Sequence, residues 1–140
     1  MKSTATLADA GFLVALFNDA DTHHASAVAM LGRLAGQRMY TVWEVLAECS
    51  RLLDDTGWLN LLRWAAAGRL TVFASDPADL AEIAEFTERY QDGGADLADV
   101  ALVFAADRTG IYDVLTVDRR DFDRYRSPAG KKLRRVWVSD

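Results

Sequence analysis

The chain of 140 residues has one cysteine, two prolines and no long apolar run. Cys49 alone cannot form a disulfide within the chain, and no Cys/His spacing resembles a zinc site, which fits a reducing compartment. Charged residues interrupt the apolar stretches, well short of the roughly 20 residues that a membrane span needs. No signal-peptide pattern follows Met1. We therefore expect a soluble, cytoplasmic protein.

Several common catalytic motifs are also absent. The sequence has no Gly-x-x-x-x-Gly-Lys-Ser/Thr phosphate loop, no Gly-x-Ser-x-Gly elbow and no Gly-x-Gly-x-x-Gly fingerprint. It also has no linker rich in Gly, Ser or Pro and no internal repeat. A hydrophobic fraction of 51% can fill the core of one ordinary domain. We expect a single domain over residues 1–140.

Apolar runs of strand length alternate with segments of helical periodicity. Strands separated by helices predict a mostly parallel sheet, because parallel strands need crossover connections. We therefore expect a three-layer α/β/α sandwich, with the binding crevice at the carboxyl ends of the strands. The expected strands cover residues 4–8, 39–42, 70–73, 114–117 and 136–138, and the expected helices cover residues 11–17, 22–36, 43–53, 58–67, 78–90 and 96–106.

Acidic residues stand beside apolar runs at four separate places in the chain. Carboxylates are seldom buried without a partner, and a cluster of them would have raised pKa values unless a cation compensates their repulsion. Carboxylate oxygens suit Mg²⁺ or Mn²⁺, which can activate water for attack on phosphorus. The pattern predicts a divalent-metal site. The acids are Asp9, Glu48, the pair Asp96 and Asp99, and Asp118.

Other charged residues near these acids have a second interpretation. Asp96 could equally cap a helix, because Asp there accepts hydrogen bonds from free amides. Glu44 lies one helical turn before Glu48, and Asp121 follows Asp118, but neither is assigned to the site. The net charge of −5 argues against binding nucleic acid by charge alone. A basic group near the C-terminus could surround a phosphodiester substrate or simply be solvated: Arg119, Arg120, Arg124, Arg126, Lys131, Lys132, Arg134 and Arg135.

Four segments, taken in order, resemble the PIN-domain family: residues 7–9, 41–48, 96–100 and 115–122. The compact length and the closing Thr-x-Asp-x-x-Asp-Phe pattern are similar to those of VapC-type toxins of bacterial toxin–antitoxin pairs. The resemblance implies a Mg²⁺- or Mn²⁺-dependent endoribonuclease that cuts single-stranded or looped RNA. It also implies a cognate antitoxin protein as partner and a tendency to form a homodimer.

By motif position, the resemblance implies that Asp9, Glu48, Asp99 and Asp118 are the catalytic acids. The same four residues, with Asp96 as an auxiliary, would be the metal ligands. Two other functions stay open. The chain could be a binding subunit with weak or no turnover, or a metal-dependent phosphomonoesterase of the haloacid-dehalogenase type. The phosphomonoesterase fits poorly, because it would need a second Asp where this chain has Gly11.

Overall fold

The computed structural model describes residues 5–137, except for the side chain of Arg119. Its centre is a sheet of five parallel strands in the order β3-β2-β1-β4-β5. In the central strand, Leu7 lies opposite Tyr40 of β2 and Val114 of β4. The predicted parallel sheet is confirmed. The strands are β1 (Ala5–Ala8), β2 (Arg38–Val42), β3 (Thr71–Phe73), β4 (Asp113–Leu115) and β5 (Arg134–Arg135).

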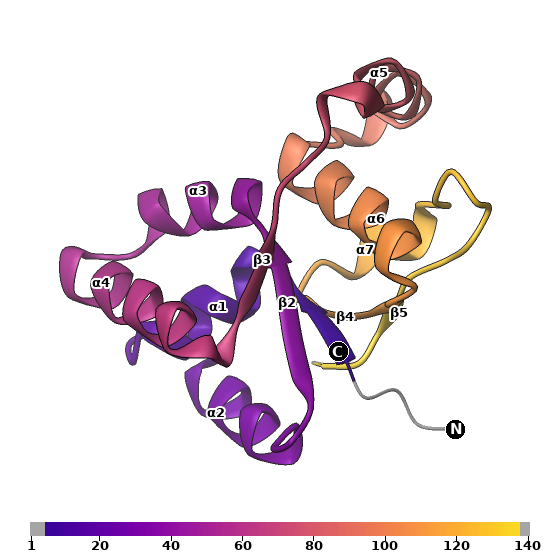
Figure 1. Cartoon of the computed structure of the whole chain (residues 1–140). Coiled ribbons are helices and arrows are strands. Elements are labelled where there is room, and N and C mark those ends of the chain that lie inside the picture. Colours follow the sequence, from indigo (N-terminus) through magenta and orange to yellow (C-terminus); the bar gives the residue numbers. More distant parts are fainter. Residues whose placement is uncertain (1–4, 138–140) are drawn as a thin grey trace.

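Helices cover both faces of this sheet, which confirms the three-layer α/β/α arrangement. Figure 1 shows the first four helices on one side of the strands and the last three on the other. The first group is α1 (Ala10–Phe17), α2 (His24–Arg33), α3 (Trp43–Leu52) and α4 (Asp55–Trp64), and the second is α5 (Leu80–Arg89), α6 (Leu97–Thr109) and α7 (Arg119–Arg124). No described helix is both long and apolar enough to cross a membrane.

Helix ends follow local capping chemistry more closely than apolar periodicity. Helix α6 begins after Asp96, whose side chain accepts a hydrogen bond from the Asp99 amide at 2.9 Å. It continues three residues beyond the expected end at 106, to Thr109, and is closed by Gly110 at a φ of 75°. The expected helix over residues 22–36 is shorter in the structure, where α2 begins at His24 without a side-chain cap and ends at Arg33.

The outer strand β5 lies earlier than the sequence predicted. The expected strand 136–138 is replaced by Arg134–Arg135, whose partners on β4 are Asp113 and Val114. Arg134 also forms two hydrogen bonds with the Asp113 carboxylate, at 2.8 and 2.9 Å. Pairing with β4 therefore decides where the strand forms. Val138, like Thr4 of the first expected strand, lies outside the described residues.

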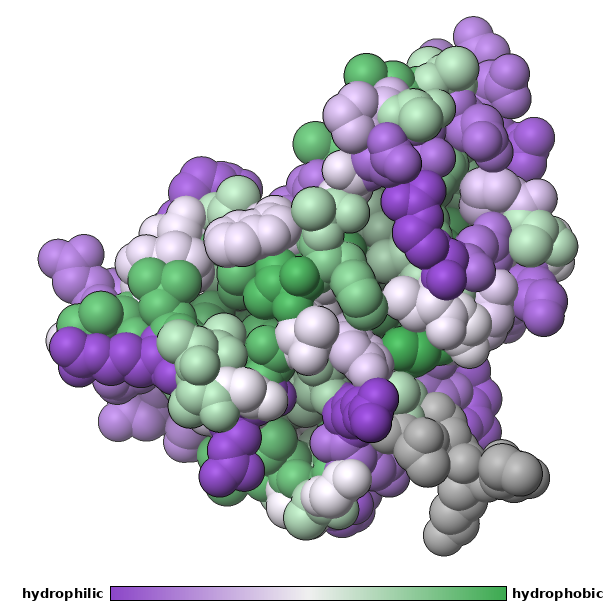
Figure 2. All heavy atoms as spheres, in the orientation of Figure 1, coloured by the Kyte–Doolittle hydropathy of each residue, from purple (hydrophilic) through white to green (hydrophobic). Residues whose placement is uncertain are grey.

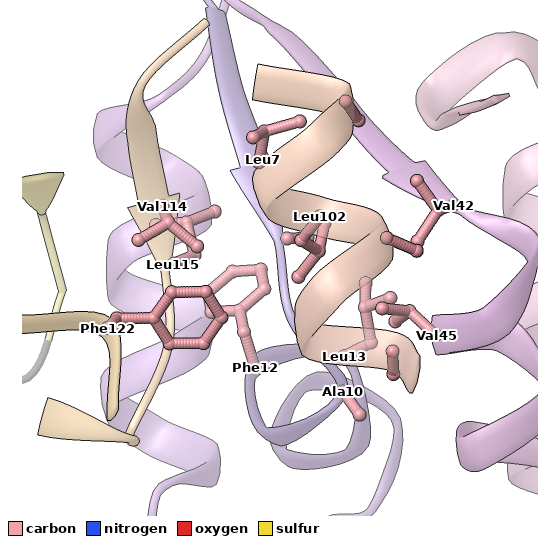
Figure 3. Packing of buried hydrophobic residues seen from close by; sticks show 14 of the residues in the cluster. Leu7, Ala10, Phe12, Leu13, Val42, Val45, Leu102, Val114, Leu115 and Phe122 are labelled. Atoms are coloured by element: carbon pink, nitrogen blue, oxygen red, sulfur yellow. The ribbon is translucent and has the colours of Figure 1, made fainter. Parts of the chain in front are cut away.

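The main hydrophobic core lies between α6 and the strands. Leu102 of α6 is fully buried, as are Leu7 of β1 and Leu13 of α1, and Figure 3 shows these side chains close together. The outer surface is mixed, with green apolar areas over α3 and α4 in Figure 2. Leu52 and Leu59, 55% and 44% exposed, contribute to the apolar surface of these two helices. The core fixes the carboxyl ends of β1 and β4. Asp9 and Asp118 lie in the segments that follow these two strands.

Candidate active site and metal centre

The carboxyl ends of β1 and β4 bring Asp9 and Asp118 to the same edge of the sheet. Ala8 pairs with Leu115, so the two strands end side by side. Thr116 links the two acids: its hydroxyl donates to Asp9 Oδ2 at 2.8 Å and accepts a hydrogen bond from the Asp118 amide at 2.9 Å. Thr116 was not among the predicted site residues, although its place in the Thr-x-Asp pattern was the available signal.

Asp9 is buried, and its carboxylate accepts hydrogen bonds from two donors. Only 7% of the residue is exposed, and the amide of Ala10 donates to Oδ1 at 2.8 Å. Burial raises the pKa of Asp9 to about 6, against the opposing effect of the hydrogen bonds from Thr116 and Ala10. The negative charges of Glu48 and Asp118 contribute to this increase. The structure therefore brings Asp9 within electrostatic reach of Glu48 and Asp118.

Asp99 lies in the first turn of α6 and is also 7% exposed. The hydroxyl of Tyr125, a fully buried residue, donates to Asp99 Oδ2 at 3.3 Å. Burial raises the pKa of Asp99 to about 8, and the negative charges of Asp9, Asp96 and Asp118 act in the same direction. Without a cation, this carboxyl group therefore holds a proton at neutral pH for much of the time.

Asp121 joins the cluster through the short helix α7. Asp118 caps this helix, with its Oδ1 accepting a hydrogen bond from the Asp121 amide at 3.0 Å. One carboxylate oxygen from each of Asp99, Asp118 and Asp121 lies within 4.8 Å of the other two. The pKa of Asp118 is raised, chiefly by burial and also by the charge of Asp121. Sequence reasoning assigned no role to Asp121.

The remaining acids divide into two groups. Burial and the charge of Asp96 raise the pKa of Glu48, and Arg51 opposes this effect. Glu48 and Asp96 therefore belong to the electrostatic cluster, while Asp96 also caps α6 as the alternative interpretation predicted. Glu44 instead accepts a hydrogen bond from the Ser75 hydroxyl at 2.8 Å, at the end of β3. The structure thus places Glu44 against Ser75.

The site fits a hard divalent cation. Three carboxylates present oxygens within reach of one ion, and all-oxygen ligands are those that Mg²⁺ and Mn²⁺ prefer. Two further observations agree with this: Asp9 and Asp99 are buried, and burial together with neighbouring negative charge raises their pKa values. A cation would remove the repulsion that now favours protonation.

A parallel α/β sheet with an acidic cluster at its carboxyl edge is the architecture of a PIN-like fold. No protein-family model matches the chain. The chain is 29% identical over 129 residues to ribonuclease VapC26 of Mycobacterium tuberculosis, covering 89% of this chain and 95% of that protein. The crystal structure of VapC20 from the same species, a toxin that cleaves the sarcin–ricin loop, has a TM-score of 0.70 at 19% identity and covers 82% of this chain and 91% of its own. These comparisons confirm the resemblance drawn from the sequence: the chain is similar in sequence to a VapC ribonuclease and in fold to a VapC toxin.

Proposed function

We propose that this chain is a metal-dependent endoribonuclease and the toxin of a type II toxin–antitoxin pair. The observation that carries the proposal is the convergence of Asp99, Asp118 and Asp121 at the carboxyl edge of the sheet. The similarity to a protein named as a ribonuclease supports cleavage of RNA. A single domain over residues 1–140 would carry the activity, in the cytoplasm where RNA is available.

The acids would have different roles in binding a Mg²⁺ or Mn²⁺ ion. Asp99, Asp118 and Asp121 offer the closest set of oxygens, with Asp9, Glu48 and Asp96 completing the negative surroundings. When bound, the ion would lower the pKa of water and offset the negative charge that develops on the phosphorus oxygens.

The protein's own side chains would orient this set and hold protons. Thr116 fixes Asp9 and Asp118 relative to each other, and Tyr125 orients Asp99. Burial and the charge of Asp96 raise the pKa of Glu48, so its carboxylate accepts a proton more readily than that of an ordinary glutamate. Glu48 could therefore keep a proton that is released from water during hydrolysis.

The proposed partners follow from the family. A cognate antitoxin protein would block the site under normal growth, and the toxin would form a homodimer. A small protein that copurifies when its gene is expressed together with this one would support the antitoxin, and a molecular mass near twice that of one chain would support the dimer.

The direct test is incubation of the purified protein with total cellular RNA and Mn²⁺, beside an EDTA control. We expect discrete fragments from wild type, none with EDTA and none from an Asp9→Asn variant. Asp19→Asn is the matched control, because Asp19 is an exposed acid outside the cluster, and it should cleave like wild type.

Other outcomes would favour the alternative functions. Release of phosphate from a small monoester, without cleavage of RNA, would identify a phosphomonoesterase. Absence of both activities, with tight binding of a copurified small protein, would identify a binding subunit. Cleavage that persists in Asp9→Asn would remove the acidic cluster from the mechanism.

A further inference from the structure

Arg124 holds its guanidinium group at the rim of the acidic cluster. It is the last residue of α7, and its Nη2 donates to Asp121 Oδ1 at 3.2 Å. The guanidinium carbon lies 5.3 Å from the ring centre of Tyr90 and 5.5 Å from that of Tyr125. Two cation–π contacts and one ion pair therefore fix a side chain that is still 36% exposed.

Gly93 leaves the space in which this guanidinium lies. A Cβ atom built on Gly93 would overlap Nη2, Cζ and Nη1 of Arg124. The φ of Gly93 is not in the left-handed region, since Gly94 and not Gly93 has a positive φ in this turn. The backbone would thus tolerate alanine at 93, and the side chain of Arg124 would have to move.

Most N–H donors of Arg124 have no protein partner among the described residues. Its described hydrogen bond uses only Nη2. Other arginines near the C-terminus differ in this respect. Both Nε and Nη2 of Arg135 bind the carboxylate of Asp123, at 2.8 and 2.9 Å, and Nη1 of Arg126 binds backbone carbonyls of the same turn. Arg124 thus combines a fixed position beside the acids with unused donors.

We propose that Arg124 forms a phosphate subsite beside the acidic cluster, where it binds a backbone phosphate of RNA. This inference rests on the proposed ribonuclease function. A guanidinium presents its donors in a planar fork that matches phosphate, and stacking on rings reduces the entropy lost on binding. The acids beside it repel an RNA backbone, so a fixed cation at their rim supplies local attraction for the strand.

The test separates RNA binding from cleavage. A fluorescein-labelled single-stranded RNA of mixed sequence is titrated in EDTA against an Asp99→Asn protein, and binding is followed by anisotropy over a range of salt concentrations. Adding Arg124→Ala should raise the Kd by about tenfold, as expected for the loss of a charge-assisted hydrogen bond. The slope of log K against log salt should become shallower by about 0.7, which corresponds to one lost phosphate contact on a single strand.

Three further variants show whether charge, position or folding is responsible. Gly93→Ala keeps every charge but displaces the guanidinium, and should weaken binding in the same direction. Arg124→Lys keeps the charge without the fork, and should recover the salt slope but only part of the affinity. Arg63→Ala removes an exposed arginine on α4, on the other side of the sheet, and should change neither quantity.

Cleavage by the metal-loaded enzyme gives an independent measurement. In the otherwise wild-type protein, Arg124→Ala should raise KM with little change in kcat, because binding to a flanking phosphate is equal in substrate and transition state. If wild type cleaves RNA but Arg124→Ala and Gly93→Ala leave the Kd, the salt slope and KM unchanged, the subsite does not exist. An effect of Arg124→Ala alone, with a lowered melting temperature, would show a structural role and overturn the inference. If wild type cleaves no RNA at all, the proposed function fails, whereas the binding titration still decides whether Arg124 contacts phosphate.

Discussion

Replacing Asp99 with asparagine should stabilise the metal-free protein at pH 8. The pKa of Asp99 rises from 3.8 to about 8 in the folded protein, so the folded state keeps a proton that the unfolded chain gives up. The contribution of Asp99 to the free energy of unfolding is therefore most favourable below about pH 4, and it is lost progressively as the pH rises to about 8. The pKa of Asp9, raised from 3.8 to about 6, acts in the same direction between those two values.

The size of the effect follows from the shift. A change of roughly four pKa units, from 3.8 to about 8, corresponds to at most about 5 kcal/mol. Asparagine removes the charge and can still accept the hydrogen bond from Tyr125, but burying its amide without a new partner offsets part of the gain. We expect a net stabilisation of about 2 kcal/mol, or a melting temperature higher by roughly 6 °C.

Thermal unfolding in EDTA at pH 5 and at pH 8 measures this prediction. At pH 5 the gain should be replaced by a destabilisation of about 2 kcal/mol, because Asp99 of the wild type is then protonated in the folded state and about 4 kcal/mol of the electrostatic cost is absent. Asp19→Asn, an exposed replacement of the same kind, controls for any general effect of removing a negative charge. A change of equal size at both pH values, or a destabilisation at pH 8, would refute the electrostatic argument.

Other predictions concern the metal, Thr116 and the core. At pH 8, Mn²⁺ should raise the melting temperature of wild type, and Asp9→Asn should remove most of that increase; an equal increase in both would place the metal elsewhere. Thr116→Val loses both hydrogen bonds to the acids and should destabilise by about 1–3 kcal/mol and shift a Mn²⁺ titration to higher concentration, whereas Thr116→Ser should restore the midpoint. Leu102→Ala should lower the free energy of unfolding by about 2–5 kcal/mol in urea and leave that midpoint unchanged.

The sequence was sufficient to predict that distant acids meet at one edge of a parallel sheet. Asp9 follows an apolar strand directly, and the carboxyl ends of parallel strands lie on the same side. The first turn of α6 was likewise predictable, because Asp96 has the spacing of a helix cap and Asp99 follows it into an apolar helix. These parts of the site depend on local signals that the fold does not override.

Sequence analysis missed α7 and placed β5 wrongly, because neither element has a local pattern of apolar residues. Helix α7 has six residues, and of these only Phe122 is apolar. Its periodicity therefore could not be seen, and without a helix nothing places Asp121 beside Asp118. The spacing of Asp118 and Asp121 was the remaining signal, since an acid three residues after a capping residue is typical of a helix start. Similarly, Arg134 and Arg135 form β5 through pairing with β4 and not through strand propensity.

Capping and metal binding need not be alternatives for the acids of this site. Asp9, Asp96 and Asp118 each begin a helix and each use Oδ1 to accept a backbone N–H. The partial positive charge at the starts of α1 and α6 offsets some of the repulsion before any cation binds. Asp96 and Asp118 thus organise the local backbone with one oxygen and leave the other oxygen for the site, whereas Oδ2 of Asp9 also accepts a hydrogen bond from Thr116.

This double role predicts a difference between two substitutions at Asp118. Asp118→Asn keeps an oxygen for the Asp121 amide, so the melting temperature in EDTA should stay within a few degrees of wild type. Asp118→Ala removes the cap and should cost about 1 kcal/mol of stability. Both variants lose a negative charge beside Asp99 and Asp121, and both should weaken Mn²⁺ binding in a titration of the melting temperature. Equal stability of the two variants would mean that Asp118 does not cap α7 in solution, and undiminished Mn²⁺ binding would mean that its second oxygen is not a ligand.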